Sequence, residues 1–166
     1  MIRVGDPAPD FELPDVDGRS HRLASQRGRL TVLNIWSAVC PWTERTDASV
    51  IEAARLSGAD LWSIAVNADE AVDQVRRVAA ERRLPLVLLD SDRRVADAYG
   101  AAATPHVFVV DAQGILRYQG APDDARFRDP EPRHRYLDDA LQALRRGESP
   151  DPTTTSAHGC AIVRMA

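Results

Sequence analysis

The sequence is most informative at residues 33–43, LNIWSAVCPWT, where an apolar run meets a cysteine and a proline. The run begins at Leu30, contains β-branched residues and follows a Gly-Arg turn, so it predicts a buried central strand over 30–36. A proline is tolerated at the start of a helix because its missing N–H is not needed there. Pro41 and the apolar spacing after it therefore predict a helix that stops at Gly58. Cys40 is expected where this strand ends and this helix begins.

Outward from this segment, the chain alternates between strand and helix signals. A small hairpin is expected from Phe11–Leu13 and His21–Leu23, on either side of a turn at 15–18. The remaining expected strands are 61–66, 84–89, 107–110 and 115–118, and the remaining expected helices are 70–83, 93–99 and 135–146. The last two strands flank Asp111–Gly114, which is a strong hairpin signal. This order predicts an α/β fold, a mixed sheet with helices on both faces, and it resembles the thioredoxin-like arrangement with an inserted strand and helix.

Length and composition indicate a single domain with a tail. The chain has 166 residues, of which 44% are hydrophobic, enough to build one sizeable core. We expect the domain to occupy residues 1–147. Residues 148–166 are rich in Pro, Ser and Thr, carry Cys160, and are expected to form a flexible C-terminal tail.

Charge and hydropathy exclude several classes of function. The net charge of -4 argues against nucleic-acid or anionic-membrane partners, which require a basic surface. All 21 basic residues are arginines, so Schiff-base chemistry and a phosphate-loop lysine are excluded. No apolar run approaches the ~20 residues that span a bilayer. The first thirteen residues lack the apolar core of a secretion signal, so a cytoplasmic location is expected, although a mature form already trimmed of a leader would look the same. The protein is expected to be a monomer or a homodimer.

The two cysteines, Cys40 and Cys160, are too few for a disulfide scaffold. In a reducing cytosol two thiols indicate buried filler, metal ligands or redox chemistry. At a helix N-terminus, unpaired N–H groups and the helix dipole favour the thiolate and can lower a cysteine pKa from ~8.5 into the range of ~3.5–7.5. The position of Cys40 therefore predicts a nucleophile. An inert buried cysteine is the alternative.

Several segments resemble one known family. LNIWSAVCPWT is similar to the VNFWATWCPPC segment of the redoxin branch of the thioredoxin superfamily, which includes TlpA-like and AhpC/TSA proteins, and GDPAPDFELPDVDG at 5–18 resembles the usual opening of that branch. Residues 153–162 and 118–124 resemble a redoxin subgroup with a CNHCPY-type active site and a GCSIK-type tail. The resemblance covers nearly the whole chain and implies a thioredoxin-like fold. It also implies that Pro105, after Thr104, is cis and faces Cys40.

The chain departs from this family at the second cysteine of the motif. In the gapless register Thr43 stands where the resolving cysteine belongs, and in the CNHCPY register Ser37 replaces the first cysteine. A hydroxyl cannot complete a disulfide, so a reductase cycle within one CxxC loop is excluded. Both hydroxyls are candidates for catalytic roles, and both are equally well explained as caps of the helix start.

The segment Ser37–Pro41 also resembles the T/S-x-x-C-P arrangement of peroxiredoxins, in which the hydroxyl orients the peroxide and the cysteine becomes sulfenic acid. However, Leu33 stands where that family has a proline, and its activating arginine is replaced around Pro105. Thiol–disulfide exchange is therefore favoured over peroxide reduction.

Cys160 lies 120 positions after Cys40. A tail that folds back over the active-site face of a thioredoxin fold would make Cys160 the resolving thiol, and the closed loop would restrain the unfolded chain by about 4–5 kcal/mol on the entropic model. A free tail thiol, or pairing between chains, is the alternative.

Other candidate residues surround the two cysteines. The resemblance implies that Trp36 shields the site, and Trp42 is a candidate contact surface for a partner, with core packing as the alternative for both. The predicted substrate-binding residues are Trp36, Pro41, Trp42, Thr104 and His106. His106 also fits an ordinary polar strand start. With His158 and the two cysteines it forms a weak candidate set for Cu(I) or Zn(II), which no CxxC or HxxxH spacing supports.

The sequence thus predicts a thioredoxin-fold thiol oxidoreductase that needs no cofactor. Cys40 attacks a disulfide or a peroxide, and Cys160 or an external thiol resolves the product. The expected partner is a disulfide-bearing protein or a small thiol or peroxide substrate. The alternative is a non-enzymatic redoxin-fold module that holds a soft metal or a partner thiol through Cys40.

Overall fold

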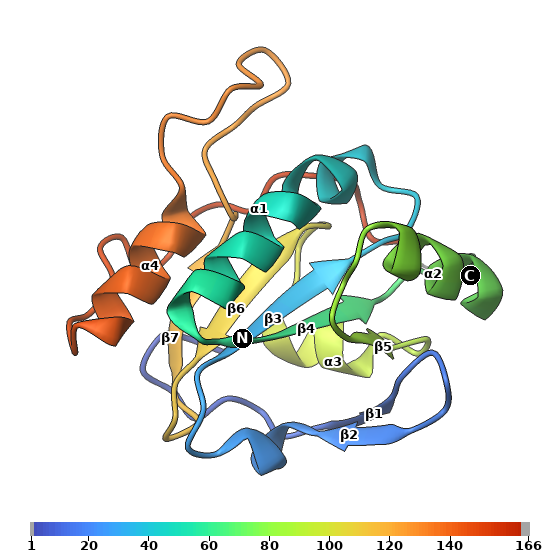
Figure 1. Cartoon of the computed structure of the whole chain (residues 1–166), viewed down its shortest axis with the longest axis horizontal. Coiled ribbons are helices and arrows are strands. Elements are labelled where there is room, and N and C mark those ends of the chain that lie inside the picture. Colours follow the sequence, from blue (N-terminus) through green and yellow to red (C-terminus); the bar gives the residue numbers. More distant parts are fainter. Residues whose placement is uncertain (1, 164–166) are drawn as a thin grey trace.

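The computed structural model describes residues 2–163 and is built around one five-stranded sheet. The strand order is β5-β4-β3-β6-β7 (Figure 1). Strands β3, β4 and β5 are parallel, whereas β6 and β7 are antiparallel to their neighbours, so the predicted mixed sheet is confirmed. The bounds are Thr31–Trp36 for β3, Asp60–Ala65 for β4, Val87–Leu89 for β5, His106–Val110 for β6 and Leu116–Gly120 for β7.

The helices cover both faces of this sheet. Alternate residues of β3 point to opposite faces, so Val32 packs with α1 and α4 while Leu33 packs with α3. Trp36 lies on the same face of the sheet as Val32 and packs against α2. The bounds are Pro41–Ser57 for α1, Val72–Glu81 for α2, Arg94–Tyr99 for α3 and Tyr136–Arg145 for α4, with a 3-10 turn at Leu23–Gln26. Among the described residues, no helix combines the length and the apolar character that a membrane crossing requires.

The N-terminal hairpin has the expected form. Strands β1 (Glu12–Pro14) and β2 (Ser20–Arg22) pair antiparallel and lie beside the sheet edge, where Asp15 bridges Leu88 of β5. Apolar residues of this segment pack into the same cluster as Tyr99 of α3. The hairpin therefore covers the face of the sheet opposite α1.

Two predicted elements are shorter than expected. The helix expected over 70–83 begins only at Val72, because Asn67 and Glu70 form a turn ahead of it and the Glu70 side chain binds the loop after β3. The strand expected over 84–89 begins at Val87, because the preceding Pro85 has no N–H to donate to a strand ladder. Neither change affects the end of the sheet at which Cys40 lies.

The C-terminal tail runs along the domain after α4 (Figure 1). Gln119 of β7 donates its N–H to the Thr153 carbonyl and accepts the N–H of Thr155, at 3.1 and 3.0 Å. The composition of the tail predicted that it is flexible. In the structure, backbone hydrogen bonds to β7 hold the tail against the domain. The last three residues of the predicted tail, 164–166, lie outside the described residues. Along this path, Cys160 reaches the end of the sheet at which β3 ends and β6 begins.

Candidate active site

Cys40 occupies the junction that the sequence predicted, after β3 and immediately before the first residue of α1. Its side chain is buried, with 2% of the residue exposed. Its sulfur is joined to that of Cys160 in a disulfide, and the two Cα atoms lie 6.1 Å apart, within the usual range for such bonds. The hypothesised pairing of the nucleophile with a thiol from the tail is therefore present in the fold.

The backbone of the tail aligns Cys160 with Cys40. Cys160 and Thr104 exchange two backbone hydrogen bonds of 2.9 Å each, which form a short antiparallel bridge. Gly159 lies so close to this bridge that a Cβ atom there would be 2.0 Å from the Thr104 carbonyl oxygen. Beyond the disulfide, the N–H of Val163 bonds to Oδ1 of Asn67 at 2.9 Å. Cys160 is thus held by its own backbone bridge to Thr104, and the chain after it is held by a hydrogen bond to the Asn67 side chain.

Thr104 and Pro105 form the wall of the site next to Cys40. The peptide bond between them is cis, as the family resemblance implied. Both residues are buried, and the Thr104 carbonyl oxygen lies 3.2 Å from the Cys40 sulfur. The Thr104 carbonyl therefore lies beside Cys40, and the predicted roles of Thr104 and Pro105 at the site stay predictions.

The hydroxyls of Ser37 and Thr43 shape the loop between β3 and α1. The Ser37 hydroxyl donates to a carboxylate oxygen of Glu70 and accepts from Nδ2 of Asn67 at 3.1 Å. The other Glu70 oxygen accepts the N–H of Ala38 at 2.9 Å. The Thr43 hydroxyl lies 2.6 and 2.8 Å from the carbonyl oxygens of Ser37 and Cys40. These contacts position the loop, and the catalytic roles of both hydroxyls stay predictions.

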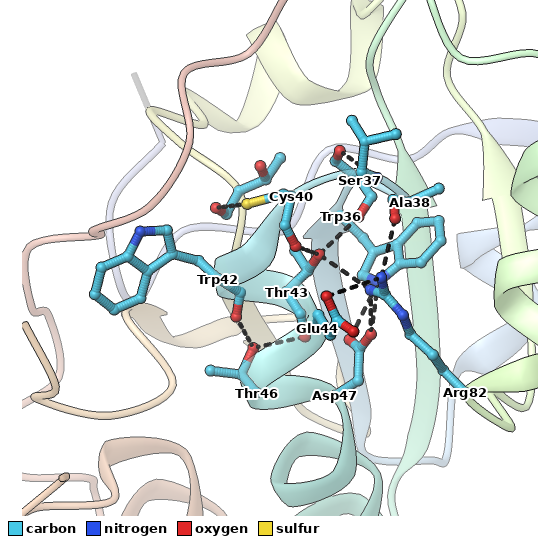
Figure 2. A network of polar contacts seen from close by, with 12 residues as sticks. Trp36, Ser37, Ala38, Cys40, Trp42, Thr43, Glu44, Thr46, Asp47 and Arg82 are labelled. Carbon is cyan, nitrogen blue, oxygen red and sulfur yellow. Dashed lines mark hydrogen bonds and ion pairs between the residues drawn. The ribbon is translucent and has the colours of Figure 1, made fainter. Parts of the chain in front are cut away.

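A polar network behind this loop was not predicted from the sequence (Figure 2). Asp47, with 2% of the residue exposed, accepts hydrogen bonds from Nε1 of Trp36 at 3.1 Å and from Arg82 at 3.0 Å. Arg82 also donates to the Ala38 carbonyl at 3.0 Å, and its guanidinium lies over the Trp36 ring at 5.8 Å. Burial raises the pKa of Asp47, against the opposing effect of the Trp36 and Arg82 hydrogen bonds. The network ties α1, α2 and the Cys40 loop together.

We expect Asp47→Ala to destabilise the protein by about 3–5 kcal/mol, because it leaves the largely buried Arg82 guanidinium and the Trp36 N–H without their acceptor. Urea unfolding measures this loss. Asp47→Asn, which keeps an acceptor oxygen, is expected to lose less. Glu44→Ala is the control, since exposed Glu44 lies 3.9 Å from Arg82, and an exposed pair contributes at most about 1 kcal/mol. Equal stability of Asp47→Ala and the parent protein would contradict this role.

His106 begins β6, which confirms the simpler of its two interpretations. Its ring stacks on Phe108 at 4.4 Å, and its Nδ1 accepts the N–H of Ala102 at 3.2 Å. Burial lowers the pKa of His106 to about 4. The predicted role of this residue in binding substrate stays a prediction.

The lowered pKa of His106 predicts a loss of stability in acid. The unfolded imidazole, with a pKa of about 6.5, binds a proton before the folded one does, so stability is lost as pH falls from about 6.5 towards 4. We expect the parent protein to lose about 3 kcal/mol more than His106→Gln between neutral pH and pH ~4. Urea unfolding at several pH values measures the difference, and parallel pH profiles of the two proteins would exclude it.

The remaining candidates lie on the surface around the disulfide. Pro41 is exposed and Trp42 is half-buried, with the Arg45 guanidinium 5.3 Å above its ring. Val39 is 55% exposed. The three residues are neighbours of Cys40 in sequence, and the predicted role of Pro41 and Trp42 in binding substrate stays a prediction.

His158, the last of the weak metal-ligand candidates, contacts an arginine. Its Nδ1 lies 3.1 Å from Nη1 of Arg126, and its pKa is lowered first by burial and then by the charge of Arg126. Within residues 2–163, no three or more His, Cys, Asp or Glu side chains are grouped in a way that could hold a metal ion.

Comparisons with known proteins agree with the fold. The AhpC/TSA family model matches residues 4–119. The thiol-disulfide oxidoreductase ResA of Geobacillus thermodenitrificans is 33% identical over 120 residues, covering 70% of this chain and 68% of that protein. The thiol:disulfide interchange protein DsbE of Allochromatium vinosum is 28% identical over 128 residues, covering 74% of this chain and 70% of that protein.

Two solved structures are similar over essentially the whole chain, including the tail. A hypothetical protein from Sinorhizobium meliloti has a TM-score of 0.89 and 28% identity, covering 100% of this chain and 97% of its own. An uncharacterized conserved protein from Geobacillus kaustophilus has a TM-score of 0.90 and 26% identity, covering 99% of this chain and 94% of its own. With its family match, its oxidoreductase relatives and its thioredoxin-like sheet, the chain belongs to the AhpC/TSA family of redoxins.

Proposed function

We propose that this protein carries out thiol–disulfide exchange with disulfide-bearing partner proteins, with Cys40 as the nucleophile and Cys160 as the resolving thiol. The observation that carries the proposal is the backbone bridge between Cys160 and Thr104, which brings the tail thiol to Cys40. Two relatives named as a thiol-disulfide oxidoreductase and a thiol:disulfide interchange protein support the same chemistry.

The reaction follows from the two thiols. In the reduced protein, the Cys40 thiolate attacks one sulfur of the partner disulfide, which forms a mixed disulfide and releases the other partner sulfur as a thiolate that takes a proton from water. The Cys160 thiolate then attacks the Cys40 sulfur, forms the internal disulfide and releases the second partner thiol. Two electrons pass from the cysteine pair to the partner. A dithiol donor reverses the two steps and regenerates the reduced protein.

The tail must leave Cys40 for this cycle to start, because Cys40 is buried when it is bonded to Cys160. Once the disulfide is reduced, hydrogen bonds and apolar contacts keep the described part of the tail in place. Segments with few such contacts open at low cost in free energy. The tail therefore supplies Cys160 and also makes room for a partner.

Contacts of Ser37 support a disulfide rather than a peroxide as the oxidant. Its hydroxyl, which in the peroxidase interpretation would orient the peroxide, is bound to Glu70 and Asn67. An antioxidant role is therefore not part of the proposal. The cytoplasmic location stays a prediction, and in that compartment a Cys40–Cys160 disulfide would cycle rather than serve as a permanent staple.

Mixing the reduced protein with oxidised glutathione or insulin tests the proposal. We expect the parent protein to become oxidised to the Cys40–Cys160 disulfide while the probe is reduced, and Cys40→Ser to be inactive. Ala161→Ser, an exposed change one residue after Cys160, is the control and is expected to react as the parent does. Activity of Cys40→Ser at the parent rate, or an unreactive parent protein, would refute the proposal.

A further inference from the structure

The segment between β7 and α4 stands out from the body of the protein (Figure 1). We call residues 121–135 the projecting loop. Its base is fixed by buried Asp123, which accepts a 2.8 Å hydrogen bond from Arg45 of α1. The Asp124 carboxylate accepts the N–H groups of Arg133 and His134 at 2.8 and 3.0 Å. The loop is therefore anchored on both of its arms.

The tip of the projecting loop presents an aromatic side chain to solvent. Arg126 and Asp129 exchange two backbone hydrogen bonds of 2.8 and 3.1 Å, which close a tight turn. Phe127 lies in this turn and is 91% exposed. Exposure of a large apolar side chain is unfavourable in water, and phenylalanine and arginine are both enriched at protein interfaces. The turn therefore has the composition of a contact site.

The outer part of the projecting loop, residues 126–135, differs in charge from the whole protein. It contains four arginines and two acidic residues, whereas the chain as a whole has a net charge of -4. The two further carboxylates of the loop, Asp123 and Asp124, lie at its base, where Asp123 pairs with Arg45. A local excess of positive charge attracts a negatively charged partner, and it matters most when the rest of the surface repels that partner.

The projecting loop borders the active site on two sides. Nη1 of Arg126 lies 3.1 Å from Nδ1 of His158, two residues before Cys160. At the base, Arg45 links Asp123 to the ring of Trp42, two residues after Cys40. A partner whose disulfide reaches Cys40 would therefore come close to the projecting loop.

We infer that the projecting loop is the docking surface for the protein that exchanges disulfides with Cys40, and that this partner carries acidic and apolar residues next to its disulfide. Phe127 supplies the apolar contact, while Arg126 and Arg128 supply the charge. The inference rests on the proposed function, and it adds the class of substrate.

Two synthetic peptides test this inference. Both have the same length, one intramolecular disulfide and a leucine beside one cysteine, but one carries glutamates where the other carries lysines. Oxidised glutathione serves as a small probe. The rate at which the reduced, full-length protein reacts with each probe is measured at low and high salt.

We expect the parent protein to react with the acidic peptide about tenfold faster than with the basic one at low salt, and high salt to reduce this preference. Phe127→Ala should slow the reaction with the acidic peptide about fivefold or more, and Arg128→Glu should remove the charge preference. Both variants should keep the parent rate with oxidised glutathione. The controls are Leu56→Ala, which removes a 58% exposed side chain at the other end of α1, and exposed Arg3→Glu.

Equal rates with both peptides, or unchanged peptide rates in both loop variants, would overturn the inference while leaving the proposed function intact. A change of self-association in Phe127→Ala with unchanged peptide rates would overturn it as well, because the loop would then serve contacts between copies of this chain. A parent protein unreactive with glutathione and with both peptides would instead refute the proposed function.

Discussion

Cys160→Ser is expected to accumulate as a mixed disulfide between Cys40 and its partner. The first attack needs only Cys40, whereas release of the partner needs a second thiol, and in the variant that thiol must come from solution. A tethered group acts at an effective concentration in the millimolar range or above, so turnover with insulin at low external thiol should fall by about 100-fold or more. Acid quenching, alkylation and non-reducing mass measurement detect the trapped species.

The controls for Cys160→Ser separate the loss of the resolving thiol from the loss of stability. Cys40→Ser should form no adduct, and a high concentration of external thiol should restore part of the turnover of Cys160→Ser. The oxidised parent protein should also be more stable than Cys160→Ser by about 4–5 kcal/mol on the entropic model, since the disulfide closes a long loop. Full turnover in Cys160→Ser, with no adduct, would show that an external thiol resolves the mixed disulfide.

Gly159→Ala is expected to impair the resolving step while leaving both cysteines in place. An added Cβ would lie 2.0 Å from the Thr104 carbonyl oxygen, which belongs to the buried backbone beside Pro105 and has little room to move. The tail must therefore shift away from Thr104 and lose the two hydrogen bonds that align Cys160. A misplacement of about 1 Å can slow a reaction by about 100-fold, so we expect resolution to slow by ten- to a hundredfold.

Single-turnover experiments resolve the two steps. The rate of adduct formation on Cys40 should not fall in Gly159→Ala, whereas the rate of adduct decay should. Ala161→Ser places a comparable addition on the other side of Cys160, away from the close approach, and should decay as the parent protein does. An unchanged decay rate in Gly159→Ala would show that the bridge to Thr104 does not align the resolving thiol.

Much of the fold could be predicted because its signals are local. The continuous apolar run before Trp36, the proline after Cys40 and the turn at Asp111–Gly114 each specify a strand end, a helix start or a hairpin within a few residues. The resemblance then supplied the cis peptide bond at Pro105. The ends of helices and strands were predicted less accurately, because tertiary contacts such as those of Glu70 determine them.

The rest of the site depends on contacts between distant residues. The burial of Asp123 could not be predicted, because Arg45, with which it forms an ion pair, is distant in sequence. The pairing of Asp47 with Arg82 joins two helices in the same way. One local signal was available: Asp47 falls on the inward face of α1 among buried residues, where a carboxylate needs a partner. His21 is half-buried and bound to Asp15, a contact that was not predicted from the sequence.

We expect the sulfur atoms of Cys40 and Cys160 to form one redox couple. The most direct measurement equilibrates the protein in glutathione buffers of increasing oxidation, blocks free thiols at each point, and follows Cys40 and Cys160 by peptide mass. Both thiols are expected to disappear together in a single two-electron transition and to yield one linked peptide pair. Independent loss of the two thiols, or a glutathione adduct on Cys40 that persists beside a free Cys160, would contradict it.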